Sequence, residues 1–315
     1  MTHTDDVHSL QLKSRENAPG EATAGQHAVL CIPDRTYNVR QVNTSNSLFV
    51  AQLSQGSAED EIPRPRLDAI AQSHFTLELQ AATGDVSAAT HIRAILPTYT
   101  STGHHQAHNS TSKAALFSNI PASDRECEEA WSDLACFELD GEGLIPSASV
   151  KVKAWESMFN AATAEGVDLT APLQDAQLAS LVDPSGSQWP REVSMAVLRS
   201  MRQFGGSGEL ELDEKKCVSS VGRALLKDRA GTTSVPKASF IATWADFLPE
   251  KWRDSAELSL LRSSYKVEAG GILFVEEESN GSTTASGAKA TSETKSALGA
   301  KRKWHEKFRA SKKTA

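Results

Sequence analysis

Three histidines are the residues whose types and spacing come closest to a chemical site. His104, His105 and His108 form an H-H-x-x-H cluster, and imidazole nitrogens are common ligands of Zn²⁺. Their neighbours are Gly, Gln, Ala, Asn and Ser, and the cluster has neither a Glu in the H-E-x-x-H position nor a periodic helix to fix the rings. We therefore predict a polar loop here, without a metal site and without a cofactor.

Motifs that are typical of catalysis are not found in the sequence. Gly205-Gly206-Ser207-Gly208 lacks the G-x-x-x-x-G-K-[ST] arrangement of a phosphate-binding loop, and the end of a helix explains its glycines. Ser, His and Asp residues occur, but nothing resembles a nucleophile elbow. We predict that the protein is not an enzyme.

The four cysteines indicate buried, reduced thiols. Cys31, Cys127, Cys136 and Cys217 are far apart, and each lies in or beside an apolar segment. A zinc site or a disulfide framework would need closer pairing or an extracellular address. No apolar run approaches the roughly 18 residues of a membrane span, and the acidic, polar start does not resemble a signal peptide. We expect a cytosolic or nuclear protein that does not bind membranes.

Positive charge is concentrated at one end of the sequence. Residues 301–315 hold seven basic residues and one acidic residue, so they carry a charge of +6. Since the whole chain has a net charge of −7, residues 1–300 carry −13. Such a basic cluster is typical of local DNA contact and of nuclear import signals, and both interpretations stay open. The residues predicted to contact DNA are Lys301, Arg302, Lys303, Trp304, Lys307 and Arg309, of which Trp304 could stack on a base or pack against a domain.

A second group of polar residues lies between β-rich runs near the N-terminus. Thr, Ser and Asn are favoured in turns because their side chains bond nearby backbone amides, and this chemistry alone explains Thr36, Thr44, Ser45 and Asn46. Alternatively, these residues shape a contact with a partner protein. We predict the partner-binding set Thr36, Tyr37, Arg40, Thr44, Ser45 and Asn46, with the Tyr37 side chain in the core.

The pattern of the first hundred residues predicts a small sheet. Residues 1–26 lack periodicity and are expected to be disordered. Runs at 29–32, 36–42, 47–50, 75–79 and 91–96 predict five or six strands, with turns at Pro33-Asp34 and at 43–46. So small a sheet has edges to cover, so residues 27–98 are predicted to form a small β-barrel or half-barrel completed by partner chains. Residues 99–117 are a predicted linker.

The remaining sequence predicts short helices and one hairpin. Apolar periodicity and capping signals predict helices after Ser123, from Ser147 to near Gly166, over 173–181, from Pro190 to Gly205, from Asp213 and over 237–247. A brief strand at 209–212 and a hairpin of 265–268 with 272–275 complete the pattern. Short helices followed by a hairpin resemble winged-helix units. We predict an α+β protein with a winged-helix-like domain at 118–185, a tandem winged-helix region with its wing hairpin at 186–275, a flexible linker at 276–300 and a basic tail at 301–315.

Three blocks of residues resemble the Dcc family of sister-chromatid cohesion proteins. The blocks are Asp34, Thr36, Tyr37, Arg40, Thr44, Ser45 and Asn46, which resemble its D-x-T-Y … R/K … T-S-N signature; Leu210–Asp213, which resembles its F-E-L-D element; and Phe240–Glu250, which resembles its F-x-x-x-W … P-E element. The resemblance covers roughly residues 29–275 in scattered blocks.

The resemblance implies a non-catalytic subunit of an alternative replication factor C clamp loader. The half-barrel would assemble with the small Ctf-type subunit and the large ATPase subunit, and the winged helices would reach DNA polymerase epsilon and DNA. The sliding clamp would be an indirect partner, and the protein would act in the nucleus in DNA replication and the cell cycle. The alternative is a free-standing winged-helix DNA-binding regulator. The helices expected at 193–204 and 218–228 carry two basic residues each, which is few for a recognition helix.

Overall fold

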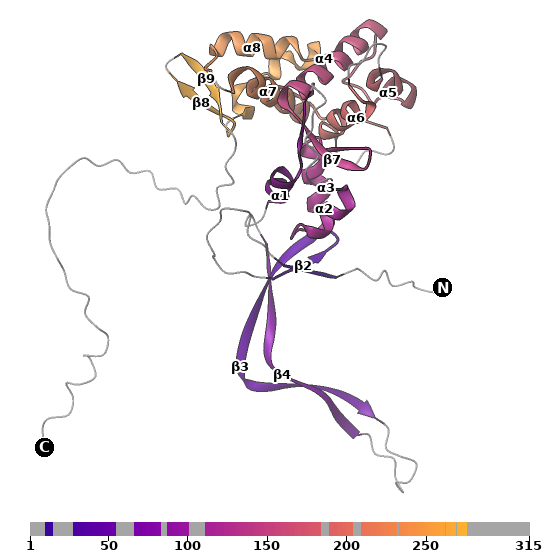
Figure 1. Cartoon of the computed structure of the whole chain (residues 1–315), viewed down its shortest axis with the longest axis vertical. Helices are drawn as coiled ribbons and strands as arrows, with labels where there is room; N and C mark the ends of the chain where they lie inside the picture. Colours follow the sequence, from indigo (N-terminus) through magenta and orange to yellow (C-terminus); the bar gives the residue numbers. More distant parts are fainter. Residues whose placement is uncertain are drawn as a thin grey trace, which may run out of the picture. The chain divides into compact units, whose positions relative to one another are not determined.

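The structure is a computed structural model that describes residues 10–14, 28–54, 66–82, 87–100, 111–183, 189–203, 209–231, 233–261, 263–268 and 270–275. Strands and helices both contribute to it, in the order drawn in Figure 1. The predicted α+β class is therefore confirmed.

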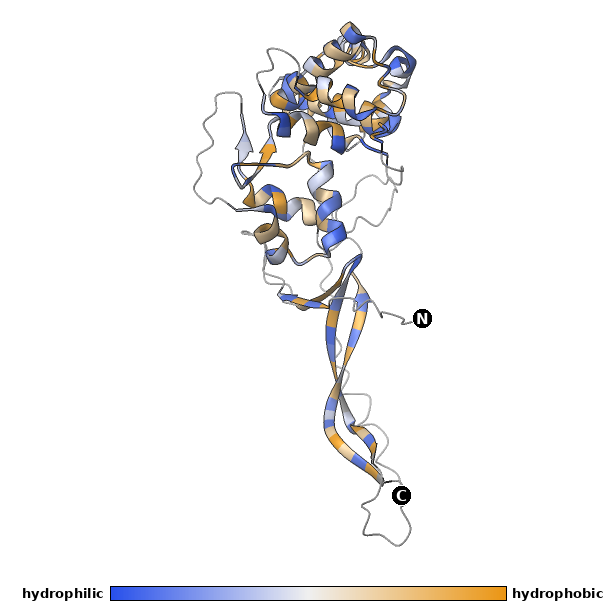
Figure 2. Ribbon diagram, turned by 90° about the vertical axis from the view of Figure 1, so that its right-hand side faces the viewer, coloured by the Kyte–Doolittle hydropathy of each residue, from blue (hydrophilic) through white to orange (hydrophobic). Residues whose placement is uncertain are grey.

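The N-terminal part is an antiparallel sheet with the strand order β1-β2-β3-β4. The strands are β1 (Gln11–Ser14), β2 (Ala28–Ile32), β3 (Arg35–Ser54) and β4 (Arg66–Ala81). Leu30 of β2 lies between Leu12 of β1 and Tyr37 of β3, and Tyr37 in turn lies opposite Ala81 of β4. From residue 39 outwards β3 pairs with β4 alone. We call this two-stranded part, residues 39–54 with 66–79, the ribbon (Figure 2).

The sheet differs from the predicted one in number and in closure. Among the described residues it has four strands rather than five or six, and it stays open because β1 and β4 are its outer strands. No closed barrel forms within the described chain. β1 lies in the segment that was expected to be disordered. The prediction missed this strand because its pairing with β2 is a long-range contact that no local periodicity reveals.

Residues 91–96, predicted as a strand, form most of helix α1 (Ala88–Ile95). The buried side chains Ala88, Ile92 and Leu96 are four residues apart, which is the spacing of one helix face. The strand prediction was wrong because Ile92, Ala94 and Leu96 also fit the alternation of a strand, whereas Ala94 is exposed in the helix.

Residues 43–46 do not form a turn. β3 continues through them, and its register shifts from Asn43 opposite Phe75 to Leu48 opposite Ser73, so residues 44–47 face His74 alone. The polar residues that favour a turn thus produce a β-bulge within a long strand, where unpaired backbone groups are tolerated at an exposed edge.

A small helical core follows the sheet. It contains α1, α2 (Lys113–Asn119) and α3 (Asp124–Asp133), packed around Ile92, Leu116, Ile120, Cys127 and Trp131. The predicted capping box at the start of α3 is confirmed: the Ser123 hydroxyl accepts from the amide of Glu126, and the Glu126 carboxylate accepts from the amide of Ser123.

The larger core gathers the rest of the described chain. Its strands are β5 (Thr98–Tyr99), β6 (Phe137–Leu139) and β7 (Glu142–Pro146) in the order β5-β7-β6, and the hairpin β8 (Tyr265–Glu268) with β9 (Gly271–Phe274). Its helices are α4 (Ala148–Glu165), α5 (Asp175–Val182), α6 (Arg191–Ser200), α7 (Glu214–Ala230) and α8 (Lys237–Asp246), with 3₁₀-helices η1 (Glu250–Ser255) and η2 (Leu258–Leu261).

Most predicted helix boundaries in this core are confirmed. Ser147 caps α4, Gly166 ends it with a φ of 70°, and Asp213 caps α7 through a 2.8 Å bond to the amide of Lys216. Two expectations were wrong. α6 ends at Ser200, before the glycines, and residues 209–212 form isolated bridges rather than a strand.

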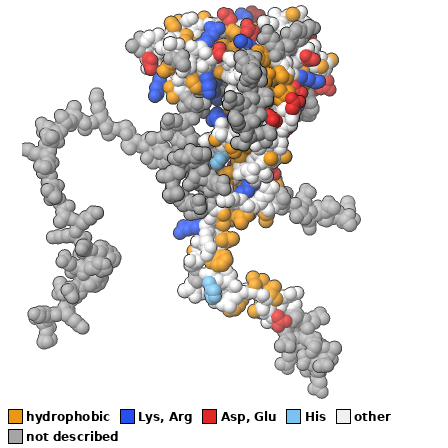
Figure 3. Space-filling view, in the orientation of Figure 1, with side chains coloured by type: hydrophobic (Ala, Val, Ile, Leu, Met, Phe, Trp, Pro, Cys, Tyr) orange, Lys and Arg blue, Asp and Glu red, His pale blue; other side chains and the backbone are white. Residues whose placement is uncertain are grey.

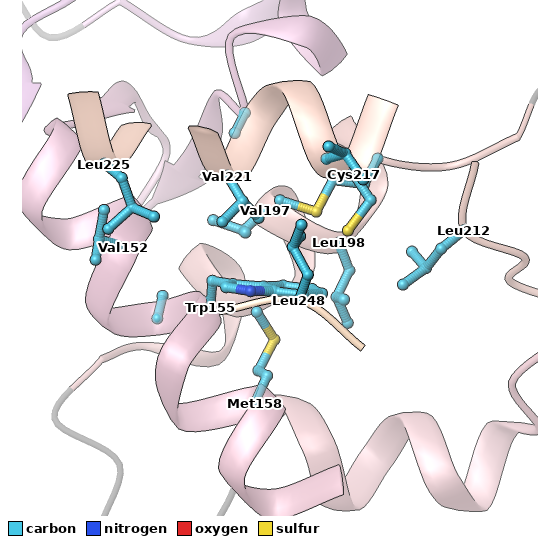
Figure 4. Packing of buried hydrophobic residues seen from close by; sticks show 14 of the residues in the cluster. Val152, Trp155, Met158, Val197, Leu198, Leu212, Cys217, Val221, Leu225 and Leu248 are labelled. Atoms are coloured by element: carbon cyan, nitrogen blue, oxygen red, sulfur yellow. The ribbon is translucent and has the colours of Figure 1, made fainter. Parts of the chain in front are cut away.

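Two tryptophans fix the packing of the larger core. Trp155 of α4 lies among apolar side chains from several elements (Figure 4), and its Nε1 donates to the carbonyl of Phe247 at 2.8 Å. Trp244 of α8 donates to the carbonyl of Val218 at 3.0 Å, and its ring lies so close to Gly222 that a β-carbon there would overlap it. Glycine at this position therefore permits the close approach of α7 and α8.

Candidate protein-binding ribbon

The inner half of the ribbon has one apolar and one polar face. Residues directly opposite each other in an antiparallel pair project from the same face of a sheet. One face carries the pairs Val39–Leu79, Gln41–Leu77 and Asn43–Phe75, and the other face carries Arg40–Glu78 and Val42–Thr76. This alternation is typical of a sheet whose apolar face packs on another layer.

No layer formed by the described residues covers the apolar face. Phe75, Leu77 and Leu79 are 44%, 58% and 49% exposed. The outer half adds further exposed apolar side chains, on both faces of the pair: Leu48, Phe49, Val50, Leu53, Leu67 and Ile70. Figure 3 shows hydrophobic side chains in orange along the ribbon. Exposed apolar side chains in this number favour an interaction site, and a lone pair of strands is marginally stable in water.

The edges of the ribbon give a second means of binding. Beyond residue 38 both β3 and β4 have one edge without a partner strand among the described residues. Unpaired amides and carbonyls along such an edge bind an added strand. A partner can therefore contact the ribbon through its apolar face, through its edges or through both.

The base of the ribbon is fixed to the start of α3 by a buried hydrogen-bond network. Thr36 is 5% exposed; its hydroxyl donates to Glu126 Oε2 at 2.5 Å and accepts from the amide of Ser123 at 2.8 Å. The amide of Arg125 donates to the carbonyl of Pro33 in the β2–β3 turn at 3.1 Å. Glu126 therefore serves both the capping box of α3 and the first residues of β3.

Lys13 makes a second attachment, from β1 to the end of α2. Its side chain is only 8% exposed, and Nζ donates to the carbonyls of Phe117 and Ala122, both at 2.9 Å. A buried ammonium needs such acceptors, and the carbonyl end of a helix also favours positive charge. The two attachments make the base of the sheet part of the small helical core.

The predicted partner-binding residues are distributed from this base to the bulge. Thr36 is buried within the chain, Tyr37 is half-buried and Arg40 is exposed opposite Glu78. Ser45 and Asn46 are exposed at the bulge; Thr44 lies beside them, and its side chain is outside the described residues. The structure does not gather the six into one cluster. The exposed apolar residues of the ribbon were not among them, although the alternation of Phe75, Leu77 and Leu79 was a signal for them.

Other sequence-based expectations fall on different parts of the chain. The basic tail, with Lys301, Arg302, Lys303, Trp304, Lys307 and Arg309, and the histidine cluster lie outside the described residues. All four cysteines are unpaired and buried, as predicted, and burial raises the thiol pKa values, to about 12 for Cys127 and Cys136. None of the described helices has the length and apolar character needed to cross a membrane.

Comparison with models of protein families identifies a match. A family model described as "Sister chromatid cohesion protein Dcc1" matches residues 5–279. This range contains all three blocks on which the resemblance to the Dcc family rests. No curated protein matches the chain.

Proposed function

Because the chain belongs to the Dcc1 family of sister chromatid cohesion proteins, we propose that it is a non-catalytic subunit of an alternative replication factor C clamp loader. In this role the ribbon binds the small Ctf-type subunit and the C-terminal end of the large ATPase subunit. ATP hydrolysis belongs to other subunits. The protein acts in the nucleus, during DNA replication, and reaches the sliding clamp only through the assembled loader.

The uncovered apolar face of the ribbon is the observation that carries this proposal. Leu77 and Leu79 project from the same face and are exposed, while the base of the same sheet is held by Thr36 and Lys13. A firmly held base with an uncovered face favours a partner that packs on the face or adds strands beside it. A polar ribbon would have supported the free-standing regulator instead.

The test is co-expression of the full chain with the small Ctf-type subunit, followed by size-exclusion chromatography with mass detection. We expect a stable one-to-one complex. The double variant L77S/L79S, on the apolar face, should weaken it at least tenfold, since burying each leucine contributes about 1.5–3 kcal/mol. The matched control T76S/Q80S changes two residues of the same strand on the opposite face and should leave the complex intact.

Two results would contradict the proposal. One is a folded monomer that ignores the partner, which would favour the free-standing regulator. The other is a complex that L77S/L79S and T76S/Q80S affect equally, which would exclude the apolar face as the binding surface. Circular dichroism of each variant alone establishes that it is folded.

The helical part supports the second half of the proposal, contact with DNA polymerase epsilon and with DNA. Short helices α7 and α8 are followed by the β8–β9 hairpin, an order that resembles a winged helix with its wing. The proposed domain at 186–275 rests on this order of elements, and the proposed domain at 118–185 rests on the resemblance to the Dcc family. Within the tail, we propose that the six residues named above contact DNA phosphates and one base.

Salt dependence of DNA binding tests the role of the tail. Each lysine or arginine that contacts a phosphate of duplex DNA contributes about 0.9 to the slope of log affinity against log salt concentration. The variant K301Q/R302Q/K303Q should flatten that slope, whereas K312Q/K313Q, two basic residues outside the proposed set, should change it less. An unchanged slope for the first variant would leave only the nuclear import interpretation.

A further inference from the structure

A pocket of about 560 Å³ lies between the small and the large helical core. Its walls come from the end of α3, the end of β7, the first turns of α4, the end of α6, the middle of α7 and the end of β9. None of its lining residues belongs to β1–β4, so it is separate from the ribbon. Its size is typical of a site that holds one or two side chains or a small molecule.

The charged residues of this pocket are mostly positive. Among the described residues that line it, Arg93, Lys151, Arg223 and Lys227 are basic and Asp133 is the one acidic residue. They come from α1, α3, α4 and α7, so the fold, rather than one basic segment, brings them together. The protein around them is acidic, with a net charge of −7 for the whole chain, so this cluster is a local exception.

Lys151 is the innermost of these cations. Its Nζ donates to the carbonyl of Leu134 at 2.7 Å. The pKa of Lys151 is lowered to about 8, mainly by burial and in smaller part by the nearby positive charges of Arg93, Lys227 and Arg223, with Cys136 acting in the opposite direction. The pocket therefore has a positive potential that a bound anion would neutralise.

The walls between the cations are apolar. They include Leu134, Ile145, Val152, Val221 and Leu225, and Phe274 lies beneath the ammonium of Lys227, 5.4 Å from Nζ to the ring centroid. A DNA duplex would contact a wide basic surface through its phosphates and would leave such walls unused. A ligand with carboxylates beside an apolar side chain can pair with the cations of the pocket and also pack against its apolar walls.

We propose that this pocket binds an acidic peptide segment of a partner protein, with an aromatic or aliphatic side chain seated between α4 and α7 and carboxylates paired with Arg93, Arg223, Lys227 and Lys151. The N-terminus of α4, with its hydroxyl-bearing cap Ser147, lines the same pocket and adds favourable backbone amides. The inference is independent of the ribbon, and it concerns a different binding event.

The experiment uses the full chain and a fluorescein-labelled probe peptide, Glu-Asp-Leu-Phe-Asp-Glu, with fluorescence anisotropy as the readout. Two control peptides separate the contributions: one replaces the acids by their amides and the other replaces Leu-Phe by Ser-Ser. We expect the probe to bind and each control peptide to bind at least tenfold more weakly, because charge-assisted hydrogen bonds and apolar burial both contribute.

Protein variants localise the binding. R93Q/R223Q removes two exposed cations of the pocket and should weaken the binding of the probe at least tenfold. The control K153Q/K215Q removes two exposed cations of α4 and α7 that do not line the pocket, and it changes the net charge equally. It should change the affinity less than about twofold, as screened distant charges do.

The chain itself carries three consecutive acids, residues 276–278, shortly after Phe274. These acids could compete with the probe by charge alone, so the titration is repeated with E276Q/E277Q/E278Q. Failure of the probe to bind both proteins would overturn the proposal. The proposal would also be overturned if R93Q/R223Q and K153Q/K215Q weakened binding of the probe equally. The same holds if R93Q/R223Q weakened the binding of DNA but not the binding of the peptide.

Discussion

In the helical core, Trp155, Phe240 and Trp244 are almost fully buried, whereas Phe75, Leu77 and Leu79 of the ribbon are largely exposed. Both regions have a clear apolar face, one with the period of a helix and one with the period of a strand. In the first, the chain supplies the covering layer itself; in the second, the described chain supplies none. Periodicity thus identifies an apolar face but does not identify what packs on it, so stability and assembly should depend on different residues.

The largest effect should come from Trp155→Ala. Loss of this side chain leaves a cavity and an unpaired carbonyl at Phe247, and we expect the free energy of unfolding to fall by about 3–5 kcal/mol. Urea unfolding followed by circular dichroism measures it. The aromatic Phe75→Ala on the ribbon is the matched control, and an equal loss for both variants would break the comparison.

A pH series should reveal the buried charge of the helical core. The pKa of Lys151 is lowered from 10.5 to about 8, so between these pH values the unfolded chain holds a proton that the folded chain has lost. The Lys151 contribution to the free energy of unfolding therefore rises with pH over this window, by up to about 3 kcal/mol. The buried thiols act in the opposite direction above pH 9, because their pKa values are raised.

The measurement is consequently a difference between the wild type and Lys151→Met. Met keeps most of the side-chain volume and cannot titrate, so only the pH dependence of the difference is informative. A difference that is constant from pH 8 to 10.5 would show that Lys151 stays charged throughout.

An intermediate effect should come from the base of the ribbon. Thr36→Val keeps the shape of the side chain but removes the hydroxyl, leaving Glu126 and the amide of Ser123 with one buried partner fewer. We expect a loss of about 1–3 kcal/mol in the free energy of unfolding. The control is Thr76→Val, an exposed residue of the ribbon, which should stay within about 0.5 kcal/mol of the wild type.

The smallest effect on the isolated chain should come from Leu77→Ala. Truncation of an exposed leucine removes few packing contacts, so we expect the free energy of unfolding in urea to change by no more than about 0.5 kcal/mol. Leu225→Ala in α7, a buried leucine, should cost about 2–5 kcal/mol by the same measurement. Similar losses for the two leucines would mean that part of the chain covers the ribbon in solution.

The helices were predictable because their signals are local. Ser123, Ser147 and Asp213 each place a side-chain oxygen against the first-turn amides of the helix that follows, and Gly166 ends α4 in a conformation that glycine adopts without strain. Such contacts span a few residues, so a sequence pattern contains them completely.

The features that the pattern missed depend on distant residues. β1 is held by β2 and by Lys13, whose acceptors lie more than a hundred residues away. α1 was predicted as a strand because Ile92, Ala94 and Leu96 fit the alternation of a strand as well as Ala88, Ile92 and Leu96 fit a helix face. The exposure of Leu77 and Leu79, and the meeting of Arg93 with Arg223, follow from packing that no local signal contains. The candidate site was thus predictable in position, but the residues that form its surface were not.

The uncovered ribbon has a consequence for the cell that makes this protein. A newly synthesised chain without its partner displays open strand edges and a row of leucine and phenylalanine side chains, the features that promote aggregation and that chaperones and proteases recognise. Surplus copies should therefore be short-lived, and the abundance of the protein should follow that of whatever covers the ribbon.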